Sequence, residues 1–205
     1  MDRLDKTRRV QFKGPIYCFP HRGVYRPEKV STPLRVVFDP ACLHQGVSLN
    51  SSVYEGPILI GNLFSVHLHF REDLVAIVGD ISKMFLQVML KPEDTEVHGF
   101  LSRNLDSSGE PDVYRMRVGE KPSPAMVSFV MLLIAKKFRI AHPEASLILQ
   151  HGRYLDDLIH SCPPVAHATQ LTSYVDRILK DGSSVVDKWY YSSAEGQEGF
   201  QWSRR

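Results

Sequence analysis

The sequence has few of the features that mark secreted, membrane-spanning or repetitive proteins. Its three cysteines, Cys18, Cys42 and Cys162, are odd in number and lack metal-ligand spacing. The longest apolar run covers residues 129–135, far short of the roughly 20 residues that a bilayer span needs. The charged N-terminus leads into no apolar signal segment, and no internal repeat is visible. We therefore expect an intracellular protein, cytoplasmic or nuclear, with reduced cysteines and no membrane span.

A strong charge of either sign is also missing. The 25 Lys and Arg residues nearly balance the 23 Asp and Glu residues, which leaves a formal net charge of +2. Bulk charge therefore does not identify a nucleic-acid binder, and local clusters must carry that argument. With 205 residues and 43% hydrophobic content, the chain can form one domain or two small lobes with a sizeable core.

A pair of adjacent acids is the most informative local feature. Asp156 and Asp157 lie between short apolar runs at 147–149 and 158–159, which predict two strands of a hairpin with both acids at its tip. Neighbouring ionised carboxylates repel each other, and a fold tolerates them mainly when a cation neutralises them. Hard oxygen ligands favour Mg²⁺ or Mn²⁺. A solvated acidic turn is the simpler alternative, so the pair needs support from elsewhere.

The other patterns predict an α+β fold in which an antiparallel sheet is backed by helices. Strands are expected at 34–39, 74–80 and 185–191 and in two segments of 99–118, helices at 63–70, 123–140 and 164–180, and a loop at 41–62. The helix at 123–140 is apolar on nearly all sides, which predicts a central, buried helix.

Two charged residues in these strands have competing interpretations. The buried strand at 74–80 ends in Asp80, which either joins the acidic pair or caps the helix-like segment that follows. Arg35 lies between apolar neighbours in its strand, so it either binds an anion such as phosphate or points outward from an edge strand. If Asp80 meets Asp156 and Asp157 on the sheet, the three carboxylates match what two-metal phosphoryl transfer needs.

At this point the chain resembles a family, the reverse transcriptases, most closely the polymerase domain of Pao/BEL-type LTR retrotransposons. The matching stretches are residues 17–27 (YCFPHRGVYRP), 34–39 (LRVVFD), 46–50 (GVSLN), 79–85 (GDISKMF), 123–125 (SPA) and 154–157 (YLDD), in the family's order. The last tetrapeptide alone is a weak signal, whereas the ordered set is specific.

The resemblance implies a polymerase palm with partial fingers. It divides the chain into a flexible arm at 1–14, partial fingers at 15–73, a palm at 74–191 into which a fingers hairpin inserts around 99–118, and a disordered tail at 192–205. The implied activity is RNA- or DNA-templated DNA synthesis by nucleotidyl transfer with two Mg²⁺ or Mn²⁺ ions. The implied partners are template-primer nucleic acid and deoxynucleoside triphosphates.

The resemblance also implies roles for individual residues. Asp80, Asp156 and Asp157 would be the catalytic metal ligands, and Ile81 would add a backbone carbonyl. The nucleotide-binding residues implied by the family are Arg35, Ile81, Phe85, Gly119 and Lys188. Phe85 falls at the position whose aromatic ring excludes a ribose 2′-hydroxyl, although an ordinary core aromatic is the alternative.

The chain departs from the family pattern in two respects. Val118 stands where many relatives have a Gln before the glycine matched by Gly119. No stretch resembles a primer-grip hairpin, a thumb or a ribonuclease H domain, and a polymerase without a thumb has few phosphate contacts to hold a duplex. A catalytically silent palm that binds only nucleic acid or a protein partner is therefore the alternative function. An unrelated ferredoxin-like binding module is a third reading.

Overall fold

The computed structural model describes residues 17–28, 33–103, 108–115, 120–163, 165–192 and 202–204, which divide into two compact units. Unit 1 takes its described residues from Met1–Glu55 and Val88–Ser123, and unit 2 from Gly56–Gln87 and Pro124–Arg205. The sequence placed the boundary between lobes at 73/74 and a smaller insertion at 99–118. The structure instead groups residues 56–73 with the following strand, because the helix in this segment packs on the larger sheet.

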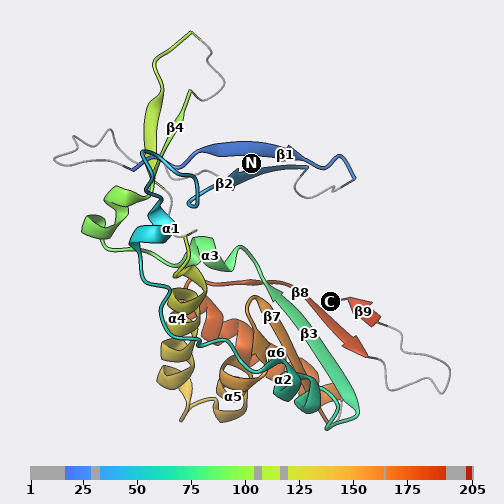
Figure 1. The fold of residues 1–205 in the computed structure, drawn as a ribbon. Coiled ribbons are helices and arrows are strands. Elements are labelled where there is room, and N and C mark those ends of the chain that lie inside the picture. The colour runs from blue at the N-terminus through green and yellow to red at the C-terminus, as the bar shows by residue number, and fades with distance from the viewer. Residues whose placement is uncertain are drawn as a thin grey trace. The chain divides into compact units, whose positions relative to one another are not determined.

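Unit 1 contains two separate antiparallel hairpins (Figure 1). β1 (His21–Tyr25) pairs with β2 (Leu34–Phe38), and β4 (Gly99–Ser102) pairs with β5 (Asp112–Arg115). The sequence patterns predicted β2 and the two strands within 99–118, but not the pairing of β1 with β2. The segment predicted as a loop at 41–62 also contains a short helix, α1 (Leu49–Ser52). Ser48 and Ser51 form a reciprocal capping box at its start, a local signal that composition alone hides. A 3-10 helix, η1 (Pro92–Val97), precedes β4.

Aromatic side chains hold unit 1 together. Phe19 and Phe100 are buried, and the ring of Phe38 lies 5.0 Å from that of Phe100 in an edge-to-face arrangement. His21, opposite Phe38 in the register, also contacts Phe100. One face of the β1–β2 hairpin therefore packs on the core, and alternation turns the next residues to the other face.

Unit 1 also contains a buried ion pair. His98 Nε2 lies 2.8 Å from Glu120 Oε2, and both side chains are almost fully enclosed. Burial lowers the pKa of His98, but Glu120 and the backbone carbonyl of Asp94 more than offset this, so the net pKa is raised. The pair joins the end of η1 to the segment that leads into the next helix.

Unit 2 is built on one five-stranded antiparallel sheet. Its strands, in spatial order, are β6 (Arg153–Tyr154), β7 (Asp157–Cys162), β3 (Val75–Ile81), β8 (Val186–Ser192) and β9 (Trp202–Arg204). The predicted strands at 74–80 and 185–191 correspond to β3 and β8. β3 lies between β7 and β8, so its apolar sequence is explained by neighbours on both sides.

Among the described residues, five helices belong wholly or mainly to unit 2: α2 (Leu63–His69), α3 (Met84–Gln87), α4 (Ser123–Phe138), α5 (Pro143–His151) and α6 (Val165–Asp181). The apolar stripe of α6 is buried, and two polar contacts fix the helix to β8. Trp189 Nε1 donates to Asp176 Oδ1 at 2.9 Å, and the hydroxyls of Thr172 and Tyr191 are 2.8 Å apart. α6 thus covers one face of the sheet.

The prediction of a strand at 147–149 was wrong, because this run lies inside α5. Pro143 occupies the first turn of α5 and Glu144 adds a favourable charge there. Ala145, Ile148 and Leu149 are buried at helical spacing. A short apolar run does not distinguish helix from strand by itself, and Pro143 was the missed signal.

The prediction of a fully buried helix at 123–140 also needs correction. α4 buries one face through Val127, Met131 and Ala135, whereas Phe129 is 54% and Leu133 is 50% exposed. Within the described chain, no helix is long and apolar enough to cross a bilayer.

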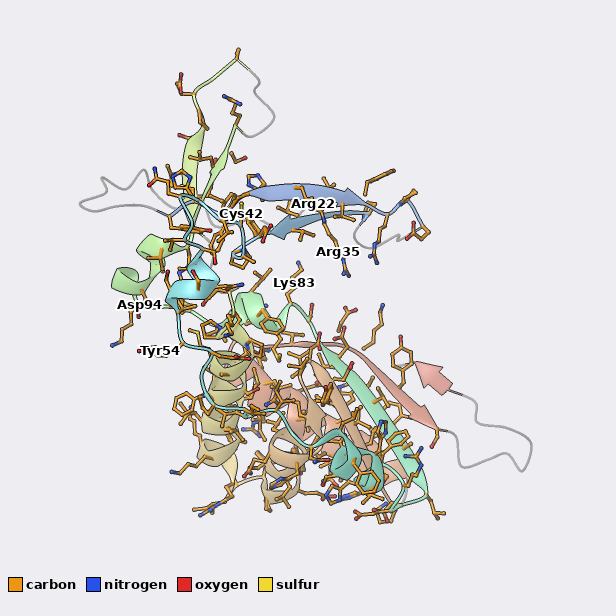
Figure 2. All side chains as sticks on the ribbon, viewed as in Figure 1. Arg22, Arg35, Cys42, Tyr54, Lys83 and Asp94 are labelled. Carbon is orange, nitrogen blue, oxygen red and sulfur yellow. The ribbon has the colours of Figure 1, made fainter. Side chains whose placement is uncertain are left out.

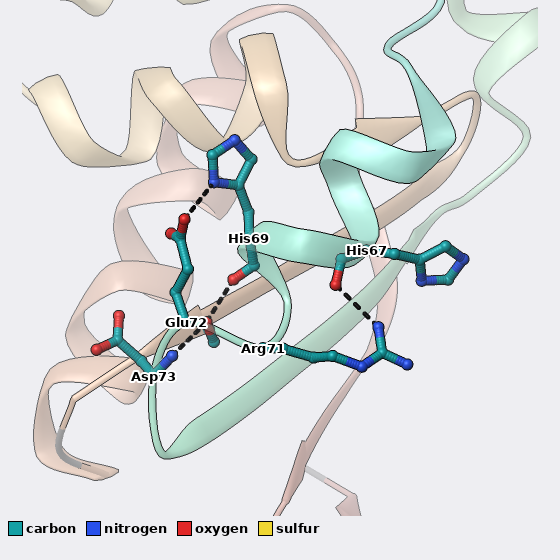
Figure 3. A network of polar contacts seen from close by, with 6 residues as sticks. His67, His69, Arg71, Glu72 and Asp73 are labelled. Atoms are coloured by element: carbon teal, nitrogen blue, oxygen red, sulfur yellow. Dashed lines mark hydrogen bonds and ion pairs between the residues drawn. The ribbon is translucent and has the colours of Figure 1, made fainter.

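α2 contacts β7, of which β6 pairs only with Asp157 and Leu158. Polar contacts join the last turn of α2 to the residues that follow it (Figure 3). The Ser161 hydroxyl donates to the His69 carbonyl at 2.6 Å and accepts from the Asp73 amide at 3.1 Å. His69 Nδ1 also lies 3.1 Å from Glu72 Oε1. The helix thereby covers an edge that would otherwise present unpaired backbone groups.

The predicted arm at 1–14 lies outside the described residues. The expectation of a disordered tail at 192–205 was wrong for the residues that are described, because Ser192 ends β8 and Trp202–Arg204 forms β9. β9 pairs antiparallel with β8, for example Tyr191 with Ser203.

Candidate functional site

Three charged residues form a row across the sheet of unit 2. In the register, Asp80 on β3 lies opposite Asp157 on β7 and opposite Lys188 on β8. Directly opposed residues share a sheet face, with Cβ atoms about 4.5–5.5 Å apart. The row therefore places a lysine on one side of Asp80 and a carboxylate on the other.

Asp156 joins this row through the turn between β6 and β7. Tyr154 pairs with Asp157, which leaves Leu155 and Asp156 as a two-residue loop. The Ile81 amide donates to the Asp156 carbonyl at 2.8 Å, so the turn is fixed to the end of β3. Although the first strand of the hairpin is β6 and not the predicted run at 147–149, the structure brings Asp80, Asp156 and Asp157 together.

The electrostatics of the three acids reflect this proximity. The pKa of Asp80 is raised by partial burial and by the charges of Asp156 and Asp187, and Lys188 opposes the shift. The pKa of Asp157 is raised by burial, then by Asp156 and Asp80. The carboxylates therefore repel one another, which is the condition that a bound cation relieves.

A β-bulge adds an acid that sequence reasoning missed. Asp80 pairs with Lys188 but Ile81 pairs with Val186, so Asp187 is an extra residue on β8. Its Oδ2 lies 3.4 Å from Lys188 Nζ, and its charge acts on Asp80. Simple alternation places Asp187 on the opposite face from Lys188, and no sequence pattern marks the bulge.

The opposite face of β3 is packed closely beneath Asp80. A Cβ atom on Gly79 would lie 2.7 Å from two ring carbons of Trp189. Trp189 is 7% exposed and is held by its bond to Asp176. Gly79 therefore allows β3 and β8 to carry Asp80 and Lys188 with a tryptophan ring under them.

The donor chemistry of Asp80, Asp156 and Asp157 suits Mg²⁺ or Mn²⁺, because all three offer carboxylate oxygens. Among the described residues, however, no three His, Cys, Asp or Glu side chains are already arranged around a single ion position. Ile81 lies at the end of β3 beside them and is buried. The three acids therefore suit such ions by their carboxylate oxygens and by lying next to one another on the sheet.

Phe85 lies on α3, four residues after the end of β3, and is half-buried. Its partial exposure disagrees with a fully enclosed core position. Asp80 does not cap this helix, because Asp80 lies within β3 and α3 begins at Met84.

Arg35 lies on β2 in unit 1 and is exposed (Figure 2). Arg22 pairs with Val37 and Arg35 pairs with Val24, so alternation puts both arginines on the same face of the hairpin. Sequence reasoning missed Arg22, because its place on the same face as Arg35 depends on the pairing of β1 with β2. Gly119, the remaining predicted nucleotide contact, lies outside the described residues.

Comparisons with known proteins identify the fold. No protein-family profile and no curated protein sequence matches the chain. A solved structure, the foamy viral protease-reverse transcriptase in complex with an RNA/DNA hybrid, is similar with a TM-score of 0.58 and 17% sequence identity. The match covers 84% of this chain and 20% of that one, so the chain spans about a fifth of the length of the viral protein. The mixed α+β chain, with antiparallel sheets and helices, therefore has a reverse-transcriptase-like fold.

Proposed function

We propose that this chain is the fingers-palm part of a retroelement reverse transcriptase, of the Pao/BEL type that its motifs resemble. Its reaction would be RNA- or DNA-templated DNA synthesis. The observation that carries this proposal is the meeting of Asp80, Asp156 and Asp157 at the sheet, with Asp157 directly opposite Asp80. The reverse-transcriptase-like fold supports the same reaction class.

Asp80, Asp156 and Asp157, with the Ile81 carbonyl, would hold two divalent ions. When bound, such ions activate an attacking oxygen and stabilise the leaving phosphates. The primer 3′-hydroxyl would attack the α-phosphorus of the incoming nucleotide, which forms the new phosphodiester bond and releases pyrophosphate. Lys188, beside Asp80, would offer its ammonium group to the negative charge that grows on this leaving group.

The remaining residues would select and orient the nucleotide. Arg35 and Arg22 present two guanidinium groups on one face of the β1–β2 hairpin, and a guanidinium binds phosphate with paired hydrogen bonds. The half-buried ring of Phe85 would contact the deoxyribose and leave no room for a 2′-hydroxyl. Template-primer nucleic acid would be the second partner, as the RNA/DNA hybrid is in the foamy viral structure.

Primer extension tests the proposal. The purified chain, with a labelled primer on RNA and DNA templates at low salt, is expected to add deoxynucleotides when Mg²⁺ or Mn²⁺ is present and to stop on chelation. Low salt is chosen because phosphate contacts provide most of the affinity. Template-primer binding without extension would instead favour the silent palm domain. Extension that survives Asp156→Asn would mean that another protein in the sample causes it.

A further inference from the structure

Arg153 is a buried cation beside the acidic turn. It lies on β6 and is 3% exposed. Its Nη1 donates to the Leu155 carbonyl at 2.8 Å, and its Nε makes a longer contact of 3.4 Å with the Leu149 carbonyl near the end of α5. Burial lowers the pKa of Arg153, but an arginine remains charged in proteins. Burying a charge costs its hydration free energy, and hydrogen bonds to protein groups must offset that cost.

The segment before α2 passes close to the backbone of Arg153. A Cβ atom on Gly61 would lie 2.9 Å from the Arg153 carbonyl, so the glycine allows the chain to pass directly over β6. Val66 on α2 is fully buried next to Gly61. This segment therefore covers Arg153 at its backbone carbonyl, while the buried side chain contacts α5 and the turn.

The turn that Arg153 contacts has an unfavourable backbone. Leu155 has a φ of +55°, in a region that residues with side chains rarely adopt. Both carbonyls of the two-residue loop are held from outside it: Leu155 by Arg153, and Asp156 by the Ile81 amide. The hydrogen bond from Arg153 therefore acts directly on the residue that has the positive φ.

We propose that Arg153 is a positioning residue, which holds Leu155 in its left-handed conformation and thereby fixes where the turn presents Asp156. Its effect on catalysis rests on the proposed function, whereas its effect on the turn does not. Groups that orient metal ligands from behind typically contribute about 10- to 100-fold in metal affinity or activity. A loss of this size is expected when the guanidinium is removed.

The structural arm of the test uses amide hydrogen exchange. Arg153→Met keeps an apolar stem but removes the donors, and Arg153→Lys restores a cationic donor group without the planar guanidinium. The Ile81 amide, which bonds to Asp156, should exchange several-fold faster in Arg153→Met, whereas the Ala76 amide, bonded to Ser192 Oγ at the other end of β3, should not. Arg153→Lys should recover part of the protection. Equal protection of Ile81 in Arg153→Met and wild type would overturn the proposal.

A second variant tests the role of backbone strain. Leu155→Gly removes the penalty for positive φ, so in the Arg153→Met background it should restore part of the lost Ile81 protection. The same loss with and without Leu155→Gly would show that Arg153 does not act on this conformation. Arg177→Met, on an exposed position of α6, removes the same charge and is the matched control; it should leave Ile81 unchanged.

The functional arm separates this proposal from the one on which it rests. In an active wild type, Arg153→Met should lower kcat and weaken Mn²⁺ binding about tenfold or more with the global Tm well above the assay temperature, and Arg153→Lys should recover part of both. A wild type that neither binds Mn²⁺ nor extends a primer refutes the proposed function. Loss of Ile81 protection in Arg153→Met would still establish that Arg153 holds the turn. Unchanged kcat and Mn²⁺ affinity in an active Arg153→Met protein refutes the positioning role.

Discussion

Gly79→Ala probes the packing beneath Asp80. The added Cβ would lie 2.7 Å from the Cε3 and Cζ3 atoms of Trp189. Carbon atoms in favourable contact are about 3.5–4.0 Å apart, so the ring or the strand must move by about 1 Å. The ring has little freedom, because it is 7% exposed and bonded to Asp176.

The expected cost of this overpacking is about 1–3 kcal/mol in the free energy of unfolding. Urea unfolding followed by far-UV circular dichroism measures it. In the Trp189→Leu background the same Gly79→Ala change should cost less than about 0.5 kcal/mol, because the conflicting ring carbons are gone.

Gly23→Ala is the control for an alanine in a strand. Its Cβ would meet the flexible end of an exposed leucine, Leu34, at 3.0 Å, so its effect should stay within about 0.5 kcal/mol. A Gly79→Ala protein as stable as wild type would refute the packing argument. So would an equal cost in both Trp189 backgrounds.

Three further predictions concern charge and substrate choice. Asp156→Asn should abolish extension, yet leave the metal-free protein as stable as wild type or slightly more stable in urea unfolding, because the charge of Asp156 raises the pKa of both neighbouring acids. The net pKa of His98 is raised from its ordinary 6.5, so its contribution to stability is complete below that value and is lost as pH rises through the folded-state pKa. Unfolding midpoints measured from pH 6 to 9 should show this loss, and Glu120→Gln should flatten it. Phe85→Val should reduce discrimination against ribonucleotides by at least about 2 kcal/mol, a factor of tens in relative kcat/KM. Unchanged sugar preference in an active variant would remove the gate assignment.

Sequence patterns predicted the three longer strands of unit 2, β3, β7 and β8, because a buried strand is a run of apolar residues. The run before Asp80 is apolar on both faces, which matches its central place between β7 and β8. The helix predicted at 164–180 is likewise present, as α6. These signals extend over several consecutive residues, so tertiary contacts do not overturn them.

Other features depend on contacts that no local pattern records. Asp187 reaches the site through a shift in pairing between β3 and β8, which is a property of two strands together. Arg153 stands next to the turn in sequence, but no sequence pattern records its burial or its contacts with the Leu149 and Leu155 carbonyls.

The most direct test of the central claim is anomalous diffraction from crystals of the wild-type chain soaked in Mn²⁺. We predict anomalous density in contact with the carboxylates of Asp80 and Asp156, and its loss in crystals of Asp156→Asn. Mn²⁺ bound at other residues, or absent from these carboxylates at saturating concentration, would contradict the account.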